Sequence, residues 1–157
     1  MRVRALIAAV AMTAATACAA RGGALELIVD DLRGGGTLHT ERVSAGAAFI
    51  LSYVHSSEHV SVRGAFEVGA DGRLTVVETA FAGFGPGLPA LREGDRWKSE
   101  GGMIVHTPAP APMDELVVRV APITRHTLAL PSGRLLHLSE AMGPGGAIRL
   151  YVRRLPR

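Results

Sequence analysis

Residues 48–81 read AFILSYVHSSEHVSVRGAFEVGADGRLTVVETAF, and this stretch decides the fold. It contains three runs of alternating apolar residues, at 48–55, 60–68 and 74–81. Polar connections separate the runs, and Asp71-Gly72 is typical of a tight hairpin turn. Because side chains of a β-strand alternate between two faces, this pattern predicts three consecutive antiparallel strands.

The same rhythm continues on both sides of this stretch, with glycine, proline or aspartate recurring about every eight to twelve residues. No convincing amphipathic helix interrupts it. The further expected strands cover residues 25–30, 38–43, 103–106, 116–120, 127–130, 135–138 and 147–153. We therefore predict an all-β fold, a single-domain antiparallel sandwich or barrel of about 8–10 strands spanning 24–157.

The N-terminus predicts a signal peptide over residues 1–19. Two arginines, Arg2 and Arg4, precede an alanine-rich apolar run that is shorter than the roughly 20 residues of a membrane-spanning helix. We expect export, to the periplasm or beyond, and no transmembrane segment after cleavage.

Cys18, the only cysteine, follows Ala15-Thr16-Ala17 at the end of this signal. Ordinary signal cleavage at an Ala-x-Ala site would release a soluble protein. Small residues before a cysteine are also similar to a bacterial lipobox, in which Cys18 is acylated and anchors the chain. Both alternatives stay open, and neither supplies a disulfide to the fold.

Charge gives no support for a nucleic-acid partner. The formal net charge of +3 includes Arg2 and Arg4 of the signal, so the exported chain is close to neutral. Its arginines are scattered, apart from a small cluster near the C-terminus, and no basic stripe appears.

A charge-free loop follows the third strand and runs from Phe81 to Pro89. Gly83, Gly85 and Gly87 give it backbone freedom, and its phenylalanines suit packing against a core. It lacks the spacing of a nucleotide-binding loop, and its prolines would break a following helix. We expect a packed turn and no cofactor. Trp97, in the charged segment that follows, is expected to fold back over it.

Alternation also assigns faces. Phe49, Leu51, Tyr53 and His55 share the bulkier face, which places His55 at the inner rim of the sheet. Glu78 shares a face with Leu74 and Val76, but the opposite face of that strand is almost as apolar. If Glu78 points inward it lies near His55, and such a pair either pins the loop or marks a site.

The sequence predicts no metal site and no catalytic set. His55 and His59 are separated by a turn, and the other histidines show no recognised zinc-ligand spacing. Ser56 lies on the opposite face from His55, and a Gly-x-Ser-x-Gly nucleophile motif does not occur.

Three motifs carry a family resemblance. They are Tyr53-x-His55-Ser56, then Glu78-Thr79-x-Phe81, then Gly83-Phe84-Gly85-x-Gly87-Leu88-Pro89. Together they resemble an uncharacterised bacterial domain of unknown function, typically encoded beside TRAP solute importers of the TAXI type. Ser57 and Gly64 depart from the pattern, since the family usually has valine and glutamate there.

The signal, the lack of a recognised catalytic set and the resemblance together predict an exported, non-enzymatic accessory of a solute uptake system, and the resemblance implies TRAP transporter components as partners. The expected binding residues are Tyr53, His55, Ser56, Glu78, Gly83, Gly85 and Gly87. Two alternatives remain. One is a periplasmic hydrolase or metal-dependent enzyme that uses His55 and Glu78, and the other is a structural envelope lipoprotein anchored at Cys18.

Overall fold

A computed structural model describes residues 24–90 and 92–156. The signal peptide predicted over 1–19 and the lipidation predicted at Cys18 lie outside the described residues.

The described chain forms eleven strands and two short helices. In chain order they are β1 (Leu25–Asp31), β2 (Gly36–Val43), β3 (Ala48–Val54), β4 (Ser61–Val68), β5 (Leu74–Phe81), β6 (Arg96–Glu100), β7 (Met103–Thr107), β8 (Glu115–Val120), the 3-10 helix η1 (Pro122–Thr124), β9 (Thr127–Ala129), β10 (Leu135–His137), α1 (Leu138–Met142) and β11 (Gly146–Arg154).

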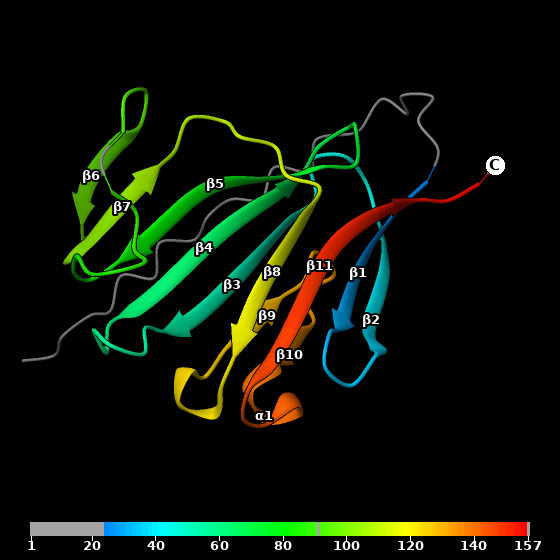
Figure 1. The fold of residues 1–157 in the computed structure, drawn as a ribbon. Helices are drawn as coiled ribbons and strands as arrows, with labels where there is room; N and C mark the ends of the chain where they lie inside the picture. Colours follow the sequence, from blue (N-terminus) through cyan, green and yellow to red (C-terminus); the bar gives the residue numbers. More distant parts are fainter. Residues whose placement is uncertain (1–23, 91, 157) are drawn as a thin grey trace, which may run out of the picture.

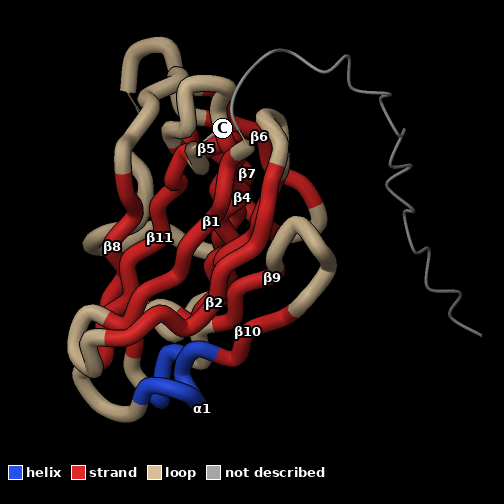
Figure 2. Tube along the Cα trace, turned by 90° about the vertical axis from the view of Figure 1, so that its right-hand side faces the viewer, coloured by secondary structure: helices blue, strands red, loops and turns tan. Residues whose placement is uncertain are grey.

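These strands form two antiparallel sheets packed face to face, so the all-β prediction is confirmed and the sandwich alternative is the one observed. The smaller sheet has four strands in the order β2-β1-β11-β8, and the larger has seven in the order β10-β9-β3-β4-β5-β7-β6. In Figure 1, β6 and β7 lie beyond the strands of the smaller sheet. Figure 2 looks onto the smaller sheet, with β8, β11, β1 and β2 side by side in front and α1 at one end of the sandwich.

The core lies between the inner faces of the two sheets. Phe49 and Leu51 of β3 are buried there, as alternation predicts, and so are Val62, Phe66 and Val68 of β4. The rings of Phe49 and Phe66 stack with their centroids 5.1 Å apart. Leu27 and Leu150 contribute fully buried side chains from the smaller sheet.

One extra residue interrupts the pairing of β4 with β5. Ala65 pairs with Glu78 whereas Phe66 pairs with Val76, so Val77 is the inserted residue of a β-bulge. Because a one-residue insertion reverses the alternation, the residues of β5 beyond the bulge change faces relative to Leu74 and Val76.

Two local predictions were wrong. Residues 96–100, where no strand was expected, form the strand β6, because Gly101 and Gly102 both adopt positive φ (+60° and +80°) and make a two-residue hairpin to β7. The C-terminal half also contains η1 and α1. Leu138, expected at the end of a strand, begins α1 and is buried.

Within residues 24–90 and 92–156, no helix is long and apolar enough to cross a membrane.

We predict that Phe49→Ala lowers the free energy of unfolding by about 3–5 kcal/mol, because it removes a stacked ring from the core. Phe84→Ala removes the same atoms from a side chain that is 62% exposed, and it should cost less than about 1 kcal/mol. Urea unfolding followed by circular dichroism measures both changes, and equal losses would contradict this assignment of the core.

Candidate functional site

A pocket of about 390 Å³ lies between the inner face of the larger sheet and β8, the edge strand of the smaller sheet. We call it the inter-sheet pocket. Its floor includes Tyr53, Val62, Gly64 and Thr79 from β3, β4 and β5, and its wall includes Leu116 and Val118 from β8. His55, Ser56, Thr124 and His126 complete one side.

Two features leave this space unfilled: Gly64 has no side chain, and the smaller sheet ends at its edge strand β8. Leu51 of β3 and Thr79 of β5 flank Gly64 in register, so this position of the floor has no side chain. A Cβ on Gly64 would come within 2.9 Å of the Phe66 ring. Since β8 has no strand on its outer side, the floor beyond it stays open.

His126 is the buried polar group of the pocket, with a residue exposure of 4%. Its ring stacks on Tyr53 at 4.9 Å, and its Nδ1 lies 2.7 Å from the Thr124 hydroxyl. The backbone N–H of His126 donates to Ser139 Oγ at 2.7 Å. Burial lowers the pKa of His126 from 6.5 to about 4 and raises the pKa of Tyr53, so both are uncharged at neutral pH.

His55 lies at the rim of this pocket, where the turn after β3 begins. Its Nδ1 accepts a hydrogen bond from the Glu58 backbone N–H at 3.4 Å and lies 3.2 Å from the Ser57 hydroxyl. With Nδ1 acting as an acceptor, the proton of the neutral ring sits on Nε2.

The glycine loop packs against this same turn. A Cβ on Gly87 would lie 3.7 Å from His55 Nε2, and one on Gly83 would lie 3.7 Å from Val60. A Cβ on Gly85 would overlap the Glu58 side chain. The structure therefore brings His55 and the three glycines together, and the carboxylate beside them belongs to Glu58.

Glu78 lies on the other face of the larger sheet. It pairs with Ala65, whose neighbours Gly64 and Phe66 face the core. The bulge at Val77 places Glu78 outside and gives Thr79 the inward position. The supposed His55–Glu78 pair does not form.

A hydrolytic arrangement at His55 is incomplete. The serine that contacts His55 is Ser57, whereas Ser56 lines the pocket. A base that activates a serine is normally oriented by a carboxylate on its other ring nitrogen. That nitrogen of His55 faces Gly87, and Glu58 contacts Ser57 Oγ instead, at 3.3 Å.

A second titratable cluster lies at the open end of the β6–β7 hairpin, far from its Gly101-Gly102 turn, and no sequence motif indicates it. His106 Nε2 donates to Asp95 Oδ2 at 2.8 Å, and both side chains are almost fully buried. The Ala109 N–H and then His106 lower the pKa of Asp95 by hydrogen bonding. Trp97 stacks on His106 at 4.2 Å and also lies 6.1 Å from Phe84 of the glycine loop. Trp97 thus reaches the loop from a strand.

No group of three or more metal-ligating side chains occurs among the residues that the structure describes.

A family comparison places the pocket in a known domain. The model of a domain of unknown function, DUF1850, matches residues 49–135, which include all of β3 except Ala48, together with β4, β5 and His126. The chain belongs to the DUF1850 family. No curated protein matches this chain, and no solved structure matches it.

In this DUF1850 protein we predict that Gly87→Ala destabilises the fold by about 1–2 kcal/mol, because φ is +80° at this position. Gly83→Ala is the matched control in the same loop, since its Cβ would make only an ordinary contact with Val60. It should change stability by less than about 0.5 kcal/mol. Thermal unfolding measures both variants, and a Gly87→Ala protein as stable as the unaltered one would contradict the positive φ described at Gly87.

We also predict that the unfolding free energy of the DUF1850 chain falls as pH drops from 6.5 to about 4. Between pH 6.5 and about 4 the unfolded chain binds a proton at His126 and the folded chain does not. The contribution of neutral His126 to the unfolding free energy is therefore complete above pH 6.5 and decreases as the pH falls toward 4. The loss from this group is at most about 3–4 kcal/mol, since one pKa unit corresponds to about 1.36 kcal/mol.

His126→Gln should remove most of this dependence of the unfolding free energy on pH. His137→Gln, which changes an exposed histidine, should leave the dependence unchanged. NMR titration of the His126 ring in the unaltered protein gives a second measurement that does not depend on a variant folding. A midpoint near 6.5 would show that burial does not depress this pKa.

Proposed function

We propose that this protein is an exported, non-enzymatic accessory of a TAXI-type TRAP solute uptake system, and that the inter-sheet pocket is its binding site. The observation that carries the proposal is that Tyr53, His55 and Ser56 of the first motif line one pocket. The glycine loop of the third motif packs against the same histidine. The first and third motifs therefore meet at one place in the fold, whereas Glu78 of the second motif lies on the other face and only Thr79 of that motif lines the pocket.

The chemistry of the pocket supports binding. Its walls are mainly apolar, with Leu51, Val62 and Leu116 among them, and a few polar groups converge on the same space. Small-molecule sites in proteins have this composition. No aspartate or glutamate lines the pocket, and Arg119 adds a positive charge at its edge. An uncharged or anionic solute with an apolar body fits this lining better than a cation does.

The N-terminal sequence supports the cellular setting. An exported protein shares its compartment with the periplasmic binding protein of a TRAP importer, and acylation at Cys18 would hold it at the membrane beside the transporter. TRAP transporter components are the proposed partners on this ground.

A hydrolase is the second candidate, and the contact between Ser57 and His55 is what favours it. The carboxylate of such a hydrolase would be Glu58, which contacts Ser57 Oγ, because Glu78 lies on the opposite face of the sheet. A broad esterase and peptidase screen with the Ser57→Ala variant as control separates the two functions. Turnover that is lost in that variant would favour the hydrolase.

The proposed function predicts that deleting the gene slows solute uptake in a strain that depends on the neighbouring TRAP transporter. The unaltered gene should restore the uptake rate and His55→Ala should not. His137→Ala is the matched control, because His137 is exposed and outside the pocket. Uptake of labelled solute is measured at equal protein levels. An unchanged rate in the deletion strain, or full rescue by His55→Ala, would contradict the proposal.

A further inference from the structure

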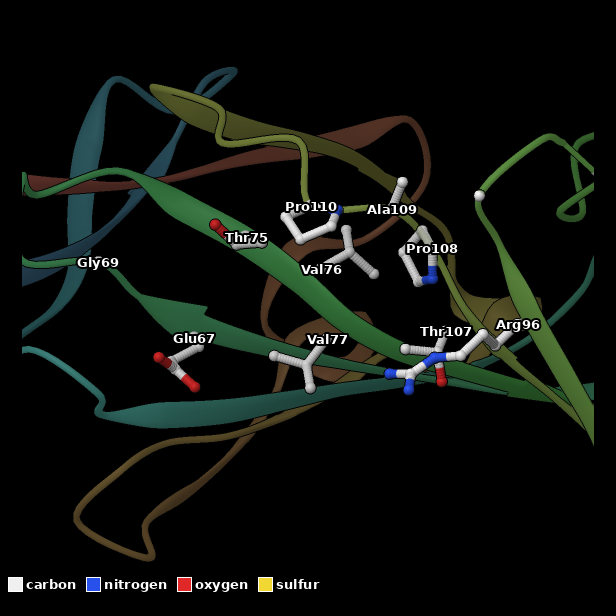
Figure 3. A pocket seen from close by; sticks show the side chains of 11 residues that line it. Glu67, Gly69, Thr75, Val76, Val77, Arg96, Thr107, Pro108, Ala109 and Pro110 are labelled. Carbon is white, nitrogen blue, oxygen red and sulfur yellow. The ribbon is translucent and has the colours of Figure 1, made fainter.

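A second pocket, of about 460 Å³, opens on the outer face of the larger sheet, away from the inter-sheet pocket. We call it the outer-face pocket. Figure 3 shows it between β5 and the segment that follows β7. Its lining includes Glu67, Val76, Val77, Arg96, Thr107 and Pro108.

The pocket exists because β5 and the chain after β7 separate and then meet again. β7 pairs with β5 only over Thr79–Phe81, and pairing resumes where Leu74 and Met113 exchange both backbone hydrogen bonds at 2.8 Å. Between these points the chain carries Pro108 and Pro110, which have no N–H to donate. The gap cannot close as a regular β-ladder.

Unpaired backbone groups of β5 therefore face the pocket. Leu74 directs its N–H and C=O toward Met113, and these directions alternate along a strand. The backbone N–H and C=O of Thr75 consequently point toward β4, and those of Val76 point into the gap. The bulge that begins at Val77 presents an apolar side chain, 43% exposed, on the floor.

Two opposite charges flank this floor. In Figure 3 the Arg96 guanidinium and the Glu67 carboxylate lie on opposite sides of Val77. Both residues are exposed, and among the described residues neither side chain makes a hydrogen bond or an ion pair. A guanidinium presents a planar fork that suits a carboxylate, and a carboxylate accepts hydrogen bonds from an ammonium group.

We propose that the outer-face pocket binds a free α-amino acid with an apolar side chain. Arg96 receives the α-carboxylate, Glu67 receives the α-ammonium group, and the side chain lies on Val77 against Pro108. The backbone of Val76 offers further hydrogen bonds. A ligand with one charge would leave one of the two protein charges unmatched, which is why the zwitterion is preferred. This site is independent of the proposed function, because it shares none of the residues of the inter-sheet pocket.

L-Leucine titrated into the ¹⁵N-labelled protein tests the proposal. Saturable NMR shift changes are expected at the amides of Val76, Val77 and Thr107. Isoamylamine lacks the carboxylate of leucine and 4-methylpentanoate lacks its ammonium group, so each should bind at least about ten-fold more weakly.

Variants sharpen the test. Arg96→Gln and Glu67→Gln should each weaken leucine binding about ten-fold. Arg63→Gln is the control. It removes one positive charge, as Arg96→Gln does, from a residue that lies on the same face of β4 as Glu67 but outside the pocket. It should change leucine binding less than about two-fold. Melting curves confirm that each variant folds.

Three results would overturn the proposal. They are no shift change at these amides up to the solubility limit of leucine, unaltered affinity in Arg96→Gln, and shifts that map to Thr79 and His126 of the inter-sheet pocket instead.

Discussion

The bulge at Val77 determines what each face of the larger sheet presents. With strict alternation from Leu74, Glu78 would share the core face with Val76 and would have to be buried beside the inter-sheet pocket. The inserted residue reverses the alternation, so a carboxylate goes to solvent and the smaller Thr79 goes inward. Burying an unpaired carboxylate is costly, and the bulge avoids this cost at one position of one strand.

The unequal size of the two sheets explains why this sandwich has an open pocket. Seven strands cannot be covered by four, and the inner face of β5, β7 and β6 extends beyond the edge strand β8. Phe81, Phe84 and Trp97 pack together over part of this extension, with the Phe81 and Trp97 rings 6.0 Å apart. Between that aromatic group and β8, Gly64 leaves the floor without a side chain.

Sequence periodicity predicted most strands because their inner faces are apolar. It failed at β6, where Trp97 is the only large apolar side chain among charged neighbours, although Gly101-Gly102 carried a readable hairpin signal. The site was predictable where its members are close in sequence, as for Tyr53, His55 and Ser56. His126 lies beside the pocket because β9, which follows it, pairs with β3. The sequence pattern around His126 does not predict a pairing between strands so far apart in the chain. Glu78 was ambiguous because a bulge leaves almost no trace in a strand that is apolar on both faces.

The protonation states of the pocket favour recognition over proton transfer. A general acid or base works best when its pKa lies near the working pH. Burial moves His126 down to about 4 and moves Tyr53 upward, so both keep one protonation state near neutrality. His126 Nδ1 is also engaged by Thr124, which holds the ring against Tyr53. If the pocket binds a solute, as proposed, a fixed hydrogen-bonding pattern on a stacked, buried pair would distinguish solutes by shape and polarity without changing the charge of the protein.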